Sequence, residues 1–482
     1  MKQIDCAFVL PGARCETMRN RRMVLDGERI SAIDGCEARE ARAILALPAL
    51  VNAHDHARAV RSSSFGAAGK PLESWLSWMA MLPPVDPYIA TAVSLARSAL
   101  GGAGVVMIHY TRVQGITDFV TEAQQVARAA RDVGVRVGFA VAMRDINPLV
   151  YGPSEPVLAG FPSAARAEVE RRLMSRPLPV SEWIARVDAV AQACGGRDFN
   201  VQYGPAGVQW CSHELLAAVA DASARTGRRV HMHLLETRYQ REWADRSYPH
   251  GIVAYLDDIG LLSPRLTLAH CTWARAEEFE RLAARGVTIA VNASSNLAIR
   301  SGIAPVAAMV RAGCRVALGL DGLALDEDDD ALRELRLNAL LHQGTGFAIE
   351  VDRSTMLAMA FVNGRRAVLG SDEGGDLAAG APADILVLDW ERVDEDRLVP
   401  ALDPCDLLFA RANARQIDEL IVTGRSIVRN GEVTGVDLPV LKSELLARLR
   451  AGIASDSRFG ETLRMLDHRM AMHYDPQHAS CW

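Results

Sequence analysis

Three histidines and one aspartate stand at the ends of short apolar runs and could together hold a metal ion. His54 and His56 end the run LPALVNAHDH, and because side chains alternate along a strand, both face the same way. His233 ends VHMHLL, and Asp321 ends RVALGLDG. Three imidazoles and one carboxylate suit Zn²⁺ with one position open for water, and Fe²⁺ is the main competitor. Such an ion lowers the pKa of its water to about 7, and Asp321 could accept the proton.

Each of these residues, and of those near them, also has a structural interpretation. An H-x-H pair is common, and one histidine can cap a strand while the other is solvated. Glu236 could stand beside the water or be a carboxylate at a helix entry. His270 ends LTLAH and could act on the substrate or be a core histidine, and His231 should lie one layer below His233 as a hydrogen-bonded core residue. Titratable groups at the ends of several runs favour a functional site.

The elements that must position these residues alternate along the chain between strands and helices. Between residues 47 and 342, eight apolar runs alternate with amphipathic segments such as SHELLAAVADASARTG, in which Ser212 is a plausible N-cap and Gly227 a plausible residue after the C-cap. This alternation predicts an α/β fold, a (β/α)8 TIM barrel, whose catalytic groups lie at the carboxyl ends of the strands. The predicted strands are 47–54, 105–111, 135–143, 199–205, 228–236, 265–272, 287–294 and 315–322.

The two flanks of the chain have a different sequence pattern, with short predicted strands separated by turns. Asp26-Gly27 lies between apolar runs, as in a hairpin, and ADILVLDW and IDELIVTGRSIVRNGEV repeat this pattern near the other end. We therefore expect residues 1–46 and 372–436 to form one small composite β-sandwich domain and residues 47–371 to form the barrel. We expect residues 437–482 to be a C-terminal helix, over 437–452, followed by an irregular tail.

The composition of the 482 residues is that of a globular enzyme, with 49% hydrophobic and 23% charged residues. A net charge of −6 gives no electrostatic reason to expect nucleic acid or a membrane surface as partner, and no apolar run approaches the ~18 residues of a membrane span. The nine cysteines are scattered without C-x-x-C spacing, which argues against a thiolate zinc site, and their odd number in a long chain argues against a disulfide framework. With no signal peptide at MKQIDCAFVL, we expect a cytoplasmic protein in a reduced state.

Several motifs, in their order along residues 25–430, together resemble the amidohydrolase superfamily, in particular its mononuclear cytosine/adenosine-type deaminase and triazine-hydrolase branch. They are LPALVNAHDH, HLLET, LAHCTW, SSNLAIRSG, LGLDG with LRELRLNALLH, NGRRAVLG and GGDLAAGAPADILVLDW. The resemblance implies one divalent metal ion held by His54, His56, His233 and Asp321. It also implies Glu236 as proton shuttle, His270 as the residue that polarises the substrate or steadies the attacking hydroxide, and Asp321 as general base.

Two departures from this superfamily bear on the site. Binuclear members rely on a carboxylated lysine on strand four. This chain has no lysine between Lys70 and Lys442, which favours a single metal ion. After strand four, many relatives show a histidine that contacts nucleoside substrates, whereas this chain reads GPAGVQW. The candidate substrate contacts are instead Gln209, Trp210, Arg144 and Trp75, although the two tryptophans could serve packing and Arg144 a surface salt bridge.

The sequence thus predicts a metal-dependent hydrolase that deaminates an amino-substituted nitrogen heterocycle, such as a purine, pterin, pyrimidine or triazine. One alternative uses the same site to cleave an amide or urea C–N bond or a C–Cl bond, and another is a barrel that binds metal or ligand without turnover. We expect a small heterocyclic molecule as substrate and a homo-oligomer as the assembly.

Overall fold

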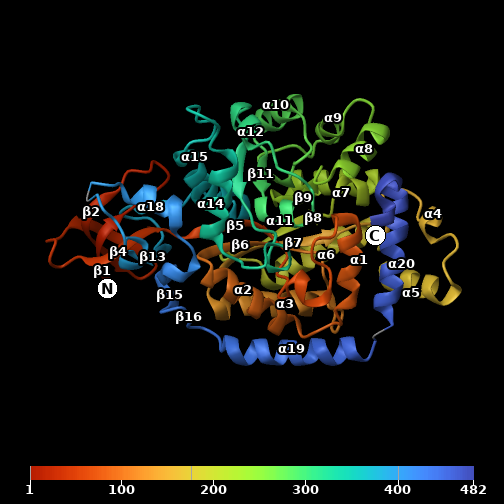
Figure 1. The fold of residues 1–482 in the computed structure, drawn as a ribbon, viewed down its shortest axis with the longest axis horizontal. Coiled ribbons are helices and arrows are strands. Elements are labelled where there is room, and N and C mark those ends of the chain that lie inside the picture. The colour runs from red at the N-terminus through yellow and green to blue at the C-terminus, as the bar shows by residue number, and fades with distance from the viewer. Residues whose placement is uncertain (1, 175, 400, 457, 482) are drawn as a thin grey trace.

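The centre of the molecule is a parallel sheet whose eight strands follow one another in sequence order around a barrel (Figure 1). The computed structural model describes residues 2–174, 176–399, 401–456 and 458–481. All eight predicted strands are confirmed, and the predicted barrel fold with them. They are β5 (Leu50–Asp55), β6 (Ala103–Tyr110), β7 (Arg136–Met143), β8 (Phe199–Pro205), β9 (Val230–Leu234), β10 (Leu266–His270), β11 (Thr288–Val291) and β12 (Arg315–Leu318).

The first and last strands of the barrel meet at the site residues rather than along a regular ladder. The backbone N–H of Asp321 donates to the carbonyl of His54 at 2.8 Å, and the N–H of Leu320 donates to the side chain of Asn52 at 2.9 Å. The chain therefore closes the barrel between β5 and the residues that follow β12, where His54 and Asp321 are candidate metal ligands.

Helices cover the outside of the barrel, and local sequence explains where they begin and end. In α7 (His213–Thr226), Ser212 accepts a hydrogen bond from the N–H of Leu215 and Gly227 has a φ of 71°, so both predicted caps are confirmed. The other helices of the barrel are α2 (Pro87–Leu100), α3 (Phe119–Val133), α6 (Val180–Cys194), α8 (Arg238–Ser247), α9 (Ile252–Asp258), α10 (Ala276–Ala284), α11 (Ala293–Ala298), α12 (Val306–Arg311), α13 (Leu323–Asp326), α14 (Ala331–His342), α15 (Arg353–Ala358) and α16 (Gly364–Leu369).

A second sheet of eight strands is built from both ends of the chain, at the left of Figure 1. Its order is β16-β15-β14-β13-β4-β1-β2-β3, so β4 (Arg42–Pro48) pairs with β13 (Ile385–Asp389) across more than 300 residues of sequence. The prediction that the two flanks form one β-rich unit is confirmed, while its boundaries with the barrel stay predictions. The remaining strands are β1 (Lys2–Val9), β2 (Met18–Asp26), β3 (Arg29–Gly35), β14 (Ile417–Val422), β15 (Arg425–Arg429) and β16 (Glu432–Val433), and α17 (Trp390–Val393) and α18 (Pro404–Arg411) accompany them.

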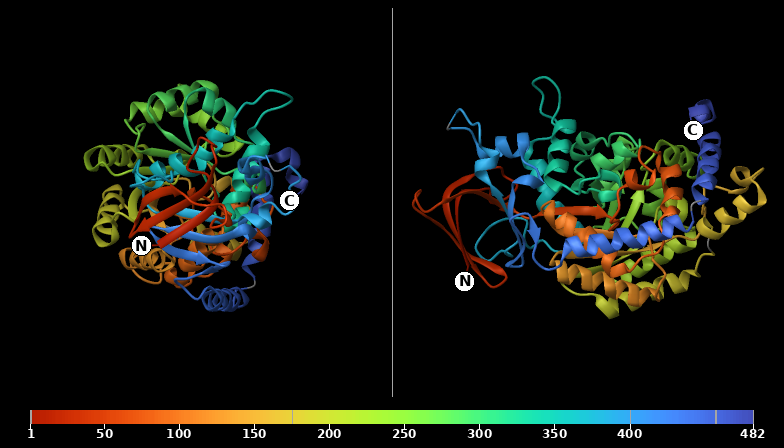
Figure 2. Two further views of the ribbon diagram at one scale, coloured as in Figure 1. Left: turned by 90° about the vertical axis from the view of Figure 1, so that its left-hand side faces the viewer. Right: turned by 60° about the horizontal axis from the view of Figure 1, so that its bottom comes forward.

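The last part of the chain forms two helices, of which the sequence predicted one. The predicted helix over 437–452 is α19 (Leu438–Ala454), which packs on α2 and crosses the bottom of Figure 1. The irregular tail was a wrong prediction, because α20 (Phe459–Tyr474) follows and buries Phe459, Leu463, Leu466 and Met470. These residues are spaced at four, three and four positions, which is one face of a helix. Figure 2 shows that α19 runs along the barrel toward α20 and the carboxyl end.

Beside α20 lie three short helices that follow strands of the barrel: α1 (Leu72–Trp78), after β5, and α4 (Glu155–Leu158) and α5 (Ser163–Leu173), after β7. Together with α13 they enclose an apolar cluster that includes Leu72, Trp75, Val157 and Leu325. The C-terminal helix is thus part of the cover over the segment that leaves the first strand of the barrel.

One disulfide joins the amino-terminal and carboxyl-terminal segments that form the second sheet, which corrects the expectation that the chain has no disulfide framework. Cys15 is bonded to Cys405, at the first turn of α18, although the scattered cysteines argued against a disulfide framework. The two residues lie 390 positions apart, so no local spacing could show the pair. Six other cysteines, Cys6, Cys36, Cys194, Cys211, Cys271 and Cys314, are free.

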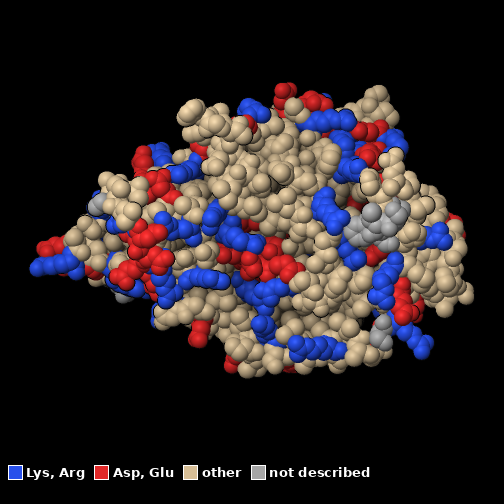
Figure 3. Space-filling view, in the orientation of Figure 1, with Lys and Arg blue, Asp and Glu red and all other residues tan. Residues whose placement is uncertain are grey.

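Within the described ranges, no helix is both long and apolar enough to cross a bilayer. On the face shown in Figure 3, basic and acidic side chains are interspersed.

Candidate metal centre and active site

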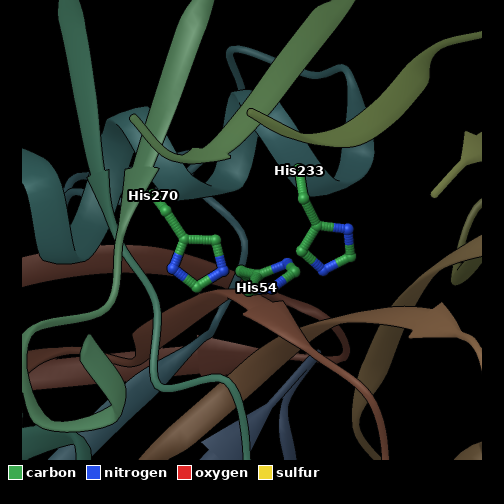
Figure 4. A group of neighbouring side chains, drawn as sticks. All are labelled: His54, His233 and His270. Atoms are coloured by element: carbon green, nitrogen blue, oxygen red, sulfur yellow. The ribbon is translucent and has the colours of Figure 1, made fainter. Parts of the chain in front are cut away.

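Four histidines and two acids, from the ends of four different strands, meet in one buried cluster. His54, His233 and His270 point toward one another (Figure 4), and their ring nitrogens lie within 4.8 Å of each other. The same holds for His54 and His56 with Asp321, and for His270 with Glu236 and Asp321. All six side chains are at least 93% buried: His54, His56, His233, Glu236, His270 and Asp321. The structure thus brings together every predicted metal ligand and every predicted catalytic residue.

The hydrogen bonds of the four imidazoles direct their other nitrogen into the cluster. Nδ1 of His56 lies 2.6 Å from the carbonyl of His109, and Nδ1 of His233 lies 2.6 Å from the carbonyl of Ala206. Because a carbonyl only accepts, these Nδ1 atoms carry the proton and the Nε2 atoms keep their lone pairs. The other two imidazoles are also held through Nδ1, which lies 2.8 Å from Nε2 of His231 in the case of His54 and 2.8 Å from Oδ1 of Asn296 in the case of His270.

The spacing of these lone pairs fits a metal ion. Nε2 of His233 lies 3.3 Å from Nε2 of His56, which in turn lies 3.1 Å from Oδ1 of Asp321. All three atoms are acceptors, so no proton can bridge them, whereas two donors bound tetrahedrally to one zinc ion stand about 3.3 Å apart. In addition, Nε2 of His54 and Oδ1 of Asp321 are buried without a hydrogen-bond partner in the part of the chain that the structure describes. The chemistry and spacing of this donor set therefore suit one divalent cation.

Beside these donors lie the second carboxyl group and the fourth imidazole. Nε2 of His270 is 3.7 Å from Glu236 and 3.9 Å from Asp321, so this imidazole stands between two acids. Burial, together with the charges of Asp321 and Glu73, raises the pKa of Glu236 well above its usual value. A buried carboxyl group that keeps its proton near neutral pH can act as a general acid.

The loop that carries Asp321 depends on its two glycines. Asp321 itself has a φ of 62°, which is uncommon for a residue with a side chain. A Cβ atom on Gly319 would lie 2.2 Å from the amide oxygen of Asn292, and one on Gly322 would lie 2.7 Å from a carboxylate oxygen of Asp55. The LGLDG motif thus permits the close approach of β11, β12 and β5 that places the carboxylate, whose second oxygen accepts a hydrogen bond of 2.7 Å from Ser295.

The candidate substrate contacts lie at different depths around this cluster. Gln209 is 1% exposed in the turn η3 (Val208–Trp210), and its amide nitrogen is buried without a hydrogen-bond partner in the described structure. Trp210 packs edge-on against Tyr151 in a separate aromatic cluster, with ring centroids 5.9 Å apart. Arg144 is exposed at the end of β7. Trp75 is 1% exposed in α1 and does not line the cluster directly, because Arg58 covers its ring. The binding roles of these four residues stay predictions.

Two residues of the site were not assigned from the sequence. His231 was placed correctly one layer deeper, but its contact with His54 gives it the task of orienting a metal ligand. Arg58 was missed altogether, although it stands two residues after His56 and its guanidinium lies 3.7 Å from Asp321. The period of two that joins His54 to His56 was the signal that could have found it.

The comparisons with known proteins agree with this geometry. The model of the amidohydrolase family matches residues 45–427, which is most of the chain. The chain belongs to the amidohydrolase family. The predictions of this family and of a hydrolase are therefore confirmed.

Among its relatives is a 5-methylthioadenosine/S-adenosylhomocysteine deaminase of Moorella thermoacetica, 30% identical over 415 residues, which are 85% of this chain and 87% of that protein. A 5'-deoxyadenosine deaminase of Methanothermobacter thermautotrophicus is 28% identical over 424 residues, or 86% of this chain and 87% of that protein. These two relatives are similar over nearly the full length of both chains.

Solved structures support the same fold. An adenosine deaminase from Xanthomonas campestris with bound zinc superposes with a TM-score of 0.77 at 23% identity, over 94% of this chain and 98% of that one. A mutant of the atrazine chlorohydrolase of Arthrobacter aurescens, complexed with zinc and atraton, also gives a TM-score of 0.77 at 23% identity, over 94% of this chain and 100% of that one. At this level of identity the likeness concerns the fold.

Proposed function

We propose that this protein hydrolytically deaminates an amino-substituted nitrogen heterocycle, such as a purine, pterin, pyrimidine or triazine. The observation that carries the proposal is the buried cluster in which Glu236 and Asp321 flank His270 beside three converging imidazoles. The relatives named as deaminases of adenosine derivatives support it. A small heterocyclic molecule is accordingly the proposed substrate.

We propose His54, His56, His233 and Asp321 as the ligands of one divalent metal ion, with zinc as the ion. Zinc is present in the adenosine deaminase and in the atrazine chlorohydrolase mutant of the same fold, and a set of three nitrogens and one oxygen is one it favours. When bound, a divalent cation supplies Lewis acidity that makes a water molecule nucleophilic near neutral pH.

The residues of this chain then divide the proton transfers between them. Glu236 donates its proton to a ring nitrogen, which makes the neighbouring amino-bearing carbon electrophilic. Asp321 accepts a proton from the attacking water and passes it to the amino group, so that the C–N bond breaks and ammonia leaves. The hydroxyl group left on the carbon then gives its proton to Glu236, which restores the acid and yields the oxo product. His270, held by Asn296 through Nδ1, presents Nε2 between the two acids and steadies the attacking oxygen.

The test is the variant Glu236→Gln, assayed for ammonia release from zinc-loaded protein with a panel of aminated heterocycles. We expect metal content to be unchanged and the rate to fall by about 100-fold or more, the usual effect of removing a general acid. The matched control is Glu214→Gln, because Glu214 is an exposed glutamate of α7 outside the site. Unchanged ammonia release in Glu236→Gln would refute the role of Glu236. An amine, a carboxylic acid or chloride as product, in place of ammonia, would favour the alternative cleavage of an amide, urea or C–Cl bond.

We further propose that the protein is a cytoplasmic homo-oligomer. The six free cysteines support a reducing compartment, and the Cys15–Cys405 disulfide opposes it. The apolar side chains of Leu340, Phe347 and Ile349, each more than 60% exposed, support an interface at the end of α14. Light scattering on the purified protein, with and without Phe347→Ser, tests the assembly.

A further inference from the structure

Arg58 is a buried cation inside the site that the proposed proton transfers do not use. Its side chain is 8% exposed, and its Nη1 lies 3.7 Å from Oδ1 of Asp321. That separation is too long for a hydrogen bond. If Asp321 serves as a metal ligand, its charge is also committed to the ion. The positive charge of Arg58 is then available to a further group in the same site.

The backbone is built to aim this side chain at the site. Ala57, the residue before Arg58, has a φ of 52°, a conformation that costs a residue with a side chain about 1 kcal/mol. One carboxylate oxygen of Asp55 accepts hydrogen bonds from the N–H groups of His56 and Ala57 at 2.6 and 2.7 Å, and the other accepts one from Asn52 at 2.6 Å. Asp55 therefore stabilises a turn that keeps Arg58 next to His56 after the strand has ended.

The guanidinium is also held in place by an aromatic ring and a hydroxyl group. Its central carbon lies 4.7 Å from the centroid of the Trp75 ring, and the indole N–H of Trp75 donates to Ser62 at 2.8 Å. Among the described residues, the hydrogen bond that Arg58 makes runs from Nη2 to the hydroxyl of Thr111 at 3.2 Å. A guanidinium has five N–H donors, so several of them remain for a ligand in the site.

We propose that Arg58 binds an oxygen carried by the substrate ring itself, so that the substrate is an oxo-substituted aminoheterocycle and not a neutral adenosine. This inference rests on the proposed function, because it places the ring at the metal centre. Arg58 stands within 4 Å of a proposed metal ligand. Its partner must therefore sit on the ring that reacts, not on a distant substituent. A carbonyl oxygen, or its deprotonated form, accepts in the ring plane, as a planar guanidinium requires.

Binding of rings that lack an amino group tests this without turnover. Calorimetry on zinc-loaded protein would compare hypoxanthine with purine, and pyrimidin-4-one with pyrimidine. In each pair the first molecule carries an oxygen on a ring carbon and, with it, a proton on the neighbouring ring nitrogen. We expect the oxo ring to bind about 10- to 100-fold more tightly, as a charge-assisted hydrogen bond allows, and Arg58→Met to remove this preference. Arg58→Lys, which keeps the charge without the planar fork, should keep part of it.

The matched control is Arg128→Met. Arg128 is an exposed residue of α3 that also lies on an aromatic ring, with its guanidinium carbon 4.0 Å from the centroid of Tyr88, but outside the site. The Arg128→Met variant should bind both members of each pair of rings as the wild-type protein does. If Arg58 only balanced the charge of Asp321, its loss would weaken both rings of a pair equally and leave their ratio unchanged. An unchanged ratio in Arg58→Met, equal binding of the two rings by the wild-type protein, or no binding of either oxo ring would each overturn the proposal.

Ammonia release separates this proposal from the proposed function. Ammonia from rings without an oxygen, and none from their oxo counterparts such as guanine or isocytosine, would leave deamination standing and overturn the assignment of Arg58. An oxo preference in binding that depends on Arg58, without ammonia from any aminated ring, would overturn deamination and leave the assignment standing.

Discussion

The C-terminal helix α20 should hold the segment after the first barrel strand in place through one buried carboxylate. Asp467 accepts hydrogen bonds from Ser74 and from the indole N–H of Trp78, the latter at 2.9 Å, and Nζ of Lys70 lies 2.7 Å from the same carboxylate. The side chains of Asp467 and Lys70 are 6% and 14% exposed. Removing one partner of a buried ion pair costs about 3–5 kcal/mol, because the other charge stays buried. We take the lower end, about 3 kcal/mol, for Asp467→Asn, since the amide can still accept from the hydroxyl and the indole.

Hydrogen exchange is the right assay, because a chain of this size does not unfold in one step. A local loss of about 3 kcal/mol corresponds to roughly 150-fold faster exchange of the amides that open with this contact. We expect this acceleration in peptides from α1 and α20 and unchanged exchange in α3. Glu461→Gln, on an exposed glutamate of α20, is the control.

The reasoning would be refuted if α20 exchanged faster while α1 did not, since the carboxylate would then not couple the two helices. It would also be refuted if adding Lys70→Met to Asp467→Asn recovered none of the lost protection, because the double variant no longer buries the charge that Asp467 offsets. Loosening of α1 should also affect activity, because Glu73 on that helix contacts residues near the site. Glu73 accepts hydrogen bonds from Tyr151 at 2.8 Å and from Thr237, the neighbour of Glu236, at 2.6 Å. We therefore expect Asp467→Asn to raise KM.

Two further predictions concern the metal and the pH dependence of stability. Dialysis against a chelator should lower the melting temperature, because an ion at 100 times its Kd contributes about 2.7 kcal/mol, and one equivalent of zinc per chain should restore it; uptake of two equivalents would contradict a single site. Burial raises the pKa of Glu334 from 4.5 to about 7, so the folded protein keeps a proton that the unfolded chain releases between these values, and stability should fall as pH rises through this window, by about 3 kcal/mol for this group. Urea unfolding at pH 5 and pH 8 should show a smaller difference for Glu334→Gln than for the wild-type protein, and an equal difference would show that Glu334 is not responsible.

The sequence predicted the barrel well because its strands are buried on both faces and therefore appear as continuous apolar runs. The candidate ligands could be found for a related reason: a titratable residue directly after such a run is conspicuous. The disulfide could not be found, because Cys15 and Cys405 meet only when the two ends of the chain fold together. Helix α20 was overlooked because arginines, acids and histidines stand between the apolar positions of its buried face.

Arg58 shows a different limit of sequence reasoning. It was not assigned from the sequence although it stands two residues after His56, because a strand pattern stops being informative where the strand ends. What returns the side chain to the site is a left-handed backbone at Ala57, held by Asp55. Alanine gives no hint of such a conformation, which is usually met at glycine or asparagine.

The sheet made from both chain ends has a consequence for synthesis on the ribosome. Strand β4 lies between β1 and β13, and β13 is translated roughly 340 residues later, which takes about 20–70 s at the usual elongation rates. During that interval the apolar strand β4 leaves the ribosome with one edge lacking its partner, and such an edge invites pairing with other nascent chains. The amino-terminal strands thus keep an open edge until the carboxyl-terminal strands arrive to cover it.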